Sequence, residues 1–268
     1  MKFHPLKILA FVFCMSHIVI APSGAQASDT SPCFEEYAST LLSSTIALTE
    51  QHIRTVEHEL AVLSVTEEVK SADWEKMHSI MHAYQKGGLP GIVWFVLPDG
   101  NYYTPEKGLV GNKLNERKYF PGLMSGRRMI GDLVYSRATG RKSVIVAVPV
   151  MRDGEVVGGL GASVFLDDLS NRIDAAVSLP ENLFFYALAP DGTTTLHKNT
   201  QLNFQDPRQQ GIESLKLAAD RMLSTPEGEV SYEFEGTSRH VIYRTSAFMG
   251  WKFAIGIKTD DSGATAGQ

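Results

Sequence analysis

IVWFVLPDGNYYT, residues 92–104, is the most informative segment of this sequence. Its first six residues are apolar and rich in β-branched and aromatic side chains, which is typical of a buried strand. The Pro98-Asp99-Gly100 sequence favours a tight turn, because proline presets φ and glycine accepts positive φ. Residues 101–104 then return as a second strand. The segment therefore predicts a β-hairpin within an antiparallel sheet.

The same pattern occurs a second time, 92 residues further along the chain, where the apolar run 183–188 precedes Pro190-Asp191-Gly192. In the first half, the hairpin is followed by a short helical segment, three strands and a connecting helix, at 118–125, 130–136, 143–151, 155–165 and 167–176. In the second half it continues with a helix and three strands, at 212–223, 229–234, 240–243 and 251–257. Such an internal repeat indicates two modules of similar architecture. Each would be an antiparallel sheet with a helical face, which is an α+β arrangement.

A long helix is expected before the first module. Residues 33–86 contain no glycine or proline, and apolar residues recur at steps of three and four from Phe34 to Leu63. This spacing predicts an amphipathic helix that runs to about residue 70. A second helix is expected to begin at 71–74 and to end at Gly87-Gly88.

The N-terminus has the three-part layout of a secretory signal peptide. Lys2 and Lys7 form a basic region, an apolar run covers 8–21, and the small residues Ala25-Gln26-Ala27 mark a cleavage point before Ser28. The apolar run has about 14 residues, whereas a helix that spans a bilayer needs about 20. We therefore expect cleavage after Ala27 and a periplasmic or secreted protein.

Composition argues against several classes of function. Removal of the leader takes the formal net charge from −5 to −7, which disfavours nucleic acids and anionic membranes as partners. Cys33 is then the only cysteine, so the count rules out an internal disulfide, a cysteine zinc site and haem attachment. His78 and His82 have a spacing that suits zinc, but the sequence indicates no further ligands. We therefore expect neither a metal nor a cofactor.

The sequence also disfavours an enzyme. It contains no Gly-x-Ser-x-Gly elbow, no P-loop and no His-Glu-x-x-His motif. A Ser-His-Asp triad stays open, because its members lie far apart in a chain. Asp167 and Asp168 are expected to cap a helix start rather than to act as paired carboxylates.

Several short motifs occur in a fixed order along the two modules. In the first they are WFVLPDG, RKYF, TG, VPV and a glycine-containing strand with its exit helix, at 94–100, 117–120, 139–140, 148–150 and 158–169. In the second they are APDG, a histidine and GW, at 189–192, 197 and 250–251. In this order the motifs resemble the double Cache family of extracytoplasmic sensor domains. The resemblance covers residues 34–257 and implies an α+β fold, in which a long N-terminal helix is followed by two PAS-like antiparallel-sheet modules.

The resemblance suggests a division of the chain. Together with the leader pattern and the small, polar residues of the C-terminal tail, it gives a signal peptide, an N-terminal helical region, a first module of the membrane-distal type, a second module and a disordered tail, at 1–27, 28–90, 91–176, 177–258 and 259–268. Family members are the extracytoplasmic parts of chemoreceptors, histidine kinases and cyclase regulators, and they continue into a second membrane helix. This sequence ends at Gln268, so we expect a free-standing periplasmic form.

The resemblance also implies a ligand site in the first module. Members that bind amino acids use an arginine, aromatics two and three residues later, a later tyrosine, and an aspartate on the last strand. These positions correspond to Arg117, Tyr119, Phe120, Tyr135 and Ser163. An arginine pairs bidentately with a carboxylate, whereas serine in place of the aspartate removes the partner of an ammonium group. We therefore expect a small carboxylate or another small anion as the ligand.

Trp94 and Tyr103 are further candidates for ligand contact, as residues of the predicted hairpin. A purely structural interpretation stays open, in which Tyr119 and Phe120 are core aromatics and Arg117 is a surface residue. His197 follows the second Pro-Asp-Gly turn, and we expect it to make a structural hydrogen bond.

These observations predict a periplasmic sensor domain that binds a small molecule and signals through a membrane-bound receptor or histidine kinase. The long N-terminal helix would also suit a homodimer. Two alternatives remain at this point. One is a non-catalytic interaction protein with a vestigial pocket, and the other is a solute-capture protein that serves a transporter.

Overall fold

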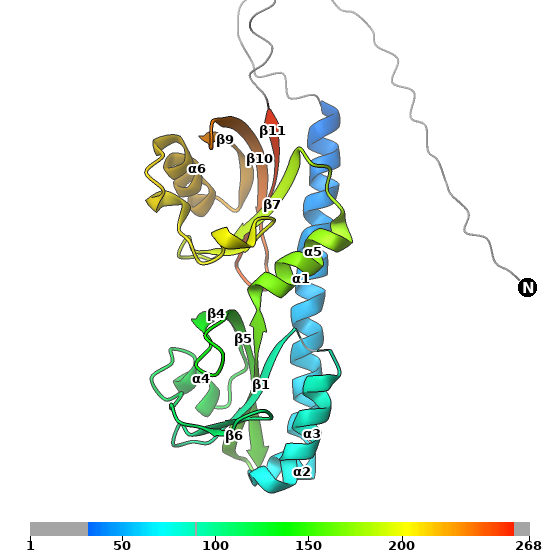
Figure 1. The fold of residues 1–268 in the computed structure, drawn as a ribbon, viewed down its shortest axis with the longest axis vertical. Helices are drawn as coiled ribbons and strands as arrows, with labels where there is room; N and C mark the ends of the chain where they lie inside the picture. Colours follow the sequence, from blue (N-terminus) through cyan, green and yellow to red (C-terminus); the bar gives the residue numbers. More distant parts are fainter. Residues whose placement is uncertain (1–31, 89, 260–268) are drawn as a thin grey trace, which may run out of the picture. The chain divides into compact units, whose positions relative to one another are not determined.

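The computed structural model describes residues 32–88 and 90–259 (Figure 1). The predicted signal peptide and residues 260–268 of the predicted tail lie outside the described residues. The described residues belong to one compact unit. In the described part of the chain, we find no helix that is both long and apolar enough to span a membrane.

The N-terminal region contains three helices, α1 at Pro32–Ser64, α2 at Glu67–Lys70 and α3 at Trp74–Lys86. The prediction that the first helix runs to residue 70 is therefore wrong at its end. Thr66 has extended backbone angles, and its side-chain oxygen accepts the Val69 N–H at 3.4 Å, which begins a new helix. Asp73 caps α3 in the same way by accepting the Glu75 N–H.

The first sheet has six strands, all paired in antiparallel fashion, in the order β3-β2-β1-β6-β5-β4. Their bounds are β1 Gly91–Val96, β2 Tyr102–Thr104, β3 Gly108–Val110, β4 Met129–Tyr135, β5 Lys142–Arg152 and β6 Glu155–Phe165. The short helix α4, Phe120–Met124, lies between β3 and β4 in the chain. The predicted hairpin is confirmed, because Val96 of β1 pairs with Tyr102 of β2.

The second sheet has five antiparallel strands in the order β8-β7-β11-β10-β9. Their bounds are β7 Leu183–Leu188, β8 Thr194–His197, β9 Glu227–Phe234, β10 Thr237–Thr245 and β11 Lys252–Thr259. Helix α5, Leu166–Val177, connects the two sheets, and α6, Glu213–Ser224, precedes β9. Two 3-10 turns, Thr200–Leu202 and Pro207–Gln209, lie between β8 and α6.

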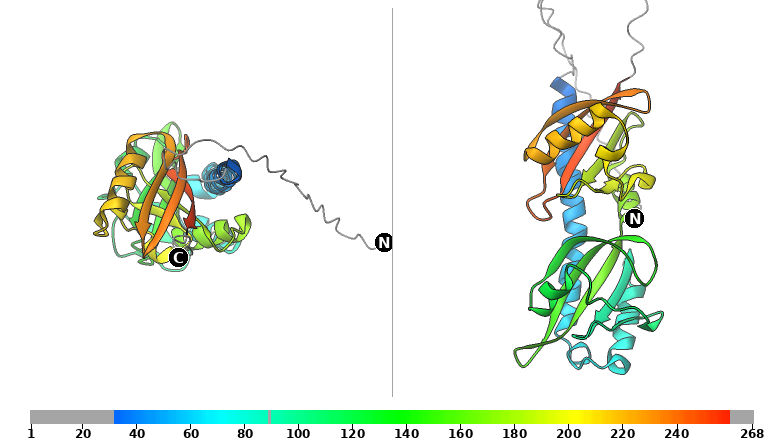
Figure 2. Two further views of the ribbon diagram at one scale, coloured as in Figure 1. Left: turned by 90° about the horizontal axis from the view of Figure 1, so that it is seen from above. Right: turned by 90° about the vertical axis from the view of Figure 1, so that its left-hand side faces the viewer.

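Each sheet uses its two faces differently. Side chains alternate along a strand, so Val93 and Phe95 of β1 pack into the core shared with α1, whereas Trp94 packs into a separate cluster on the opposite face. In the second sheet Phe185 joins the core with α1, and Tyr186 belongs to the cluster beneath α6. Seen from above, α1 and α6 lie on opposite sides of the second sheet (Figure 2). The faces turned away from α1 carry the two cavities described below.

Candidate functional site

A small cavity lies on the face of the first sheet that is turned away from α1. Its volume is about 10 Å³, which is room for about one water molecule. Its lining includes seven side chains with polar atoms, Trp94, Tyr102, Arg117, Tyr119, Ser136, Arg137 and Ser163. We call this the first cavity.

Four of the seven predicted ligand residues line the first cavity, Trp94, Arg117, Tyr119 and Ser163. Trp94 Nε1 donates a hydrogen bond to Ser163 Oγ at 3.2 Å, and the Trp94 and Tyr119 rings stack with centroids 5.9 Å apart. The indole lies close against β6, where a Cβ atom at Gly161 would come within 2.3 Å of it. The strand thus needs glycine at this position to admit the indole.

The other three predicted side chains do not line the first cavity. Phe120 is buried in the adjoining apolar cluster. Tyr103 lies on the opposite face of the sheet, because it is one residue from Tyr102, and it stacks on Trp74 with centroids 5.0 Å apart. The Tyr135 side chain is 56% exposed. Ligand contact by these three side chains therefore stays a prediction.

Tyr135 nevertheless contributes to the site through its main chain. Arg117 Nη2 donates to the Tyr135 carbonyl at 2.7 Å. The Tyr135 ring meets the Phe204 ring edge-on, with centroids 5.0 Å apart. The carbonyl that holds Arg117 thus belongs to a residue whose side chain contacts the second module.

Sequence reasoning missed three polar side chains of the first cavity, Tyr102, Ser136 and Arg137. Strand alternation gives a signal for Tyr102, since Tyr102 and Tyr103 must face opposite sides of the sheet. Arg137 offers no such signal, because its position depends on distant contacts. It forms an ion pair with Glu116 at 2.9 Å and donates to the Lys113 carbonyl.

The charged side chains that line the first cavity are both cationic. Two guanidinium groups line it, and its described lining contains no carboxylate. Arg117 Nε and the Tyr102 hydroxyl are buried and have no hydrogen-bond partner among the described residues. Burial raises the pKa of both the Tyr102 and Tyr119 phenols above the usual range, so each stays a neutral hydroxyl. A buried donor without an acceptor costs about 1–3 kcal/mol, which an anionic acceptor would offset.

Two other sequence expectations concern residues near the second module. Asp167 and Asp168 do not cap α5, because they lie inside its first turn and Phe165 precedes it without a side-chain cap. Asp168 instead pairs with Arg141 through two bonds of 2.7 and 3.0 Å. The predicted structural role of His197 is confirmed, because its Nδ1 accepts the Asn199 N–H at 2.8 Å.

The histidine pair on α3 shows no metal-binding arrangement. His78 Nε2 lies 3.3 Å from the Pro105 carbonyl oxygen, and its ring packs against Trp74 and His82. Over residues 32–88 and 90–259 the histidine, cysteine and acidic side chains form no group of three or more that could hold a metal ion.

Comparison with known proteins gives a result at the level of structure. No protein-family model matches the sequence, and no curated protein matches it. The extracellular domain of a histidine kinase, rpHK1S-Z16, has a TM-score of 0.69 at 16% identity and covers 87% of this chain and 97% of its own. The sensory domain of the Campylobacter jejuni chemoreceptor Tlp3, with isoleucine bound, has a TM-score of 0.61 at 14% identity, with 85% and 92% covered.

A third similar structure is the ligand-binding domain of the Pseudomonas fluorescens chemoreceptor CtaA in complex with L-serine. Its TM-score is 0.63 at 15% identity, and 84% of this chain and 96% of that chain are covered. Like these domains, the chain has a long N-terminal helix followed by two antiparallel sheets. The chain therefore has the double Cache fold, the α+β architecture of extracellular sensor domains.

Proposed function

We propose that this protein is a sensor domain that binds a small carboxylate, or another small anion, in its first module and signals through a partner protein. One observation carries the proposal. Two guanidinium groups meet at a cavity without a lining carboxylate, and Arg117 Nε and the Tyr102 hydroxyl are buried there without an acceptor among the described residues. A carboxylate offers the paired acceptor oxygens that an arginine fork binds best.

An α-amino acid is a poorer candidate than a simple carboxylate. Tlp3 and CtaA are described with isoleucine and L-serine, and each of these ligands carries an ammonium group as well as a carboxylate. In this chain Ser163 stands where the resemblance would place the aspartate that pairs with an ammonium group, and its hydroxyl already accepts the Trp94 indole N–H. The arginine charges would repel a second cation at this place.

Binding requires part of the cavity wall to move, because about 10 Å³ does not hold a carboxylate. The Arg117 side chain is the proposed moving part. It is only partly buried and is held by one hydrogen bond to the Tyr135 carbonyl. A ligand carboxylate would replace that carbonyl as the acceptor and would also reach Arg117 Nε.

The partner is proposed to be a membrane-bound receptor or histidine kinase, and no catalytic role is proposed for the chain. Helix α1 offers a surface for such a partner or for a second copy. Tyr37, Leu48 and Val62 are 50%, 40% and 54% exposed, and at 3.6 residues per turn their spacing returns them to about the same side of the helix. A periplasmic location after cleavage at Ala27 completes the proposal.

Ligand-dependent thermal unfolding tests the proposed site. The purified protein is heated with small carboxylates, amino acids, amines and purines. A carboxylate at about a hundredfold excess over its Kd should stabilise the fold by about 2.7 kcal/mol. Arg117→Gln should weaken this binding at least ~10-fold.

Arg128→Gln is the matched control, because Arg128 pairs with Glu57 at 2.9 Å and does not line the cavity. The proposal is wrong if amines or purines stabilise the protein instead. It is also wrong if both arginine variants respond to the carboxylate like the unmodified protein.

A further inference from the structure

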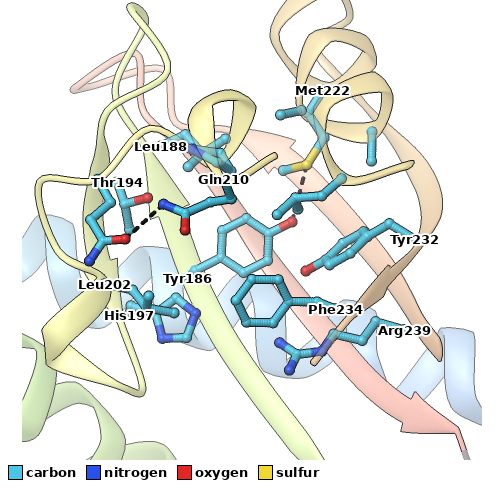
Figure 3. Close-up of a pocket in the computed structure, with 15 residues that line it drawn as sticks. Tyr186, Leu188, Thr194, His197, Leu202, Gln210, Met222, Tyr232, Phe234 and Arg239 are labelled. Carbon is cyan, nitrogen blue, oxygen red and sulfur yellow. Dashed lines mark hydrogen bonds between the residues drawn. The ribbon is translucent and has the colours of Figure 1, made fainter. Parts of the chain in front are cut away.

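The second module contains a cavity that is larger than the first cavity. It is bounded by β7, β8, β9, β10 and α6. Its volume is about 50 Å³, which is room for roughly three to five water-sized groups at ~10–15 Å³ each. In Figure 3, Arg239 and His197 lie on one side of the Tyr186 ring, whereas Leu188 and Met222 lie on the other. We call this the second cavity.

The polar end of the second cavity is built around a buried arginine. Arg239 is only 6% exposed, and its Nε has no hydrogen-bond partner among the described residues. Its Nη2 donates to Glu235 at 3.2 Å, but the Glu235 side chain is 70% exposed, so this pair is weakened by solvent. The described lining of the cavity contains no carboxylate.

Two aromatic rings hold the Arg239 guanidinium in place. Its central carbon lies 4.5 Å from the Phe234 ring centroid and 5.0 Å from the Phe184 ring centroid. Such contacts orient a cation but supply no acceptor for its N–H groups. A buried charge is expensive unless it is paired and hydrogen-bonded, so the missing partner of Arg239 Nε points to an anion.

A second donor lies at the same end. His197 Nδ1 accepts the Asn199 N–H, so the neutral ring carries its hydrogen on Nε2. Burial, followed by the charge of Arg239, lowers the pKa of His197 to about 4. The imidazole therefore stays neutral at physiological pH, and Arg239 supplies the positive charge of the cavity.

The opposite end of the second cavity is largely apolar, and the Gln210 amide beside Leu188 already donates to Gln205 Oε1 at 2.8 Å (Figure 3). Leu188, Ala219 and Met222 are buried side chains of its lining. The Tyr186 hydroxyl donates to Met222 Sδ at 3.2 Å, so it is already engaged with this wall. An occupant must therefore be polar and anionic at one end and apolar at the other.

We propose that the second cavity is a binding site for a short-chain monocarboxylate of about the size of acetate or propionate. The carboxylate would pair with Arg239 and the alkyl end would pack against Leu188, Ala219 and Met222. The alternative is an empty packing defect around a structural arginine. These two interpretations predict different binding. A binding site should bind a carboxylate more tightly than a neutral molecule of the same shape, whereas a packing defect should not.

Methyl NMR with labelled methionine gives a readout inside the second cavity. The Arg117→Gln protein is used, so that ligand in the first cavity does not contribute. Propionate should shift the Met222 methyl signal in a saturable way, and propionamide and propylammonium should bind at least ~10-fold more weakly. No saturable shift, or equal shifts from propionate and propionamide, would overturn the proposal.

Two variants make the test specific, after thermal unfolding shows that each is folded. Ala219→Leu fills the second cavity and should remove the Met222 response, and Ala218→Leu serves if that variant does not fold. Glu235→Gln removes the negative charge that competes with propionate for Arg239, so it should tighten propionate binding. Weaker binding by Glu235→Gln, or an unchanged response in the filled variant, would contradict the assignment. Because the first site is disabled throughout, failure here leaves the proposed function untouched.

Discussion

At the residue scale, the two cavities share one feature, an arginine whose buried Nε has no hydrogen-bond acceptor among the described residues. Arg117 in the first module and Arg239 in the second are both in this position. Arg117 could be predicted as a ligand residue because its motif is local in the sequence. Arg239 could not, because its burial depends on Phe184 and Phe234, which come from separate strands of the second sheet.

His197 makes stability depend on pH. Its pKa falls from 6.5 in the unfolded chain to about 4 in the fold, because burial and then Arg239 disfavour the charged ring. The unfolded state binds the proton first as pH falls, so the stabilising contribution is present above about pH 6.5 and is lost progressively toward pH 4. We expect a loss of the order of 3 kcal/mol over this range.

Chemical unfolding at several pH values checks this prediction. His197→Asn should flatten the acid limb of the stability curve, since the asparagine oxygen can still accept the Asn199 N–H. His58→Asn, at an exposed position on α1, is the control and should leave the curve unchanged. His52, whose pKa is also lowered by burial, stays in both variants. An equally steep acid limb in His197→Asn would contradict the assignment.

At the element scale, sequence periodicity was a good guide wherever a segment was long and apolar. The hairpin, the long strands β5 and β6, and the helices α5 and α6 are present where expected, within a few residues. Strand β3 at Gly108–Val110 was missed, since its three residues are too few to show alternation. Strand β8 at Thr194–His197 was implied by the repeat of the first hairpin, but its bounds were not predicted. The end of α1 was misplaced because Thr66 acts as a cap, and threonines also occur within α1 itself, so the residue type gave no boundary signal.

Strand β4 connects the first cavity to the second module. It is an edge strand, partly exposed along its length, with an irregular register between Ile130 and Leu133. Its last residue, Tyr135, holds Arg117 through the carbonyl and touches Phe204 through the ring. Phe204 has a positive φ of 67°, and its neighbours Leu202 and Gln205 line the second cavity.

Hydrogen exchange tests whether β4 and the 202–205 segment respond together. A carboxylate in the first cavity should change the exchange of β4 amides, because it displaces Arg117 from the Tyr135 carbonyl. The 202–205 segment should respond as well, because Phe204 packs on Tyr135. A response confined to β4 would show that the ligand signal does not reach the second module by this contact.

At the scale of the whole molecule, the sequence was sufficient for the architecture and insufficient for the ligand. Two apolar hairpins, an internal repeat and a long helix define the double Cache fold. The choice of ligand depends on which side chains face the cavity. Neighbouring residues of a strand face opposite sides of the sheet, as Tyr102 and Tyr103 show, so an error of one residue in the sequence prediction exchanges the cavity side chains for those of the other face. Both modules now carry a cationic cavity on the face turned away from α1.

The most direct test of the central claim is NMR of the arginine Nε–H groups, titrated with the carboxylate that stabilises the protein most. The Arg117 signal is identified by its loss in Arg117→Gln. The account predicts that this signal moves in a saturable way with the carboxylate and does not move with an amine of the same size. If the protein binds the carboxylate while the Arg117 Nε–H signal stays unchanged, the first cavity is not the ligand site.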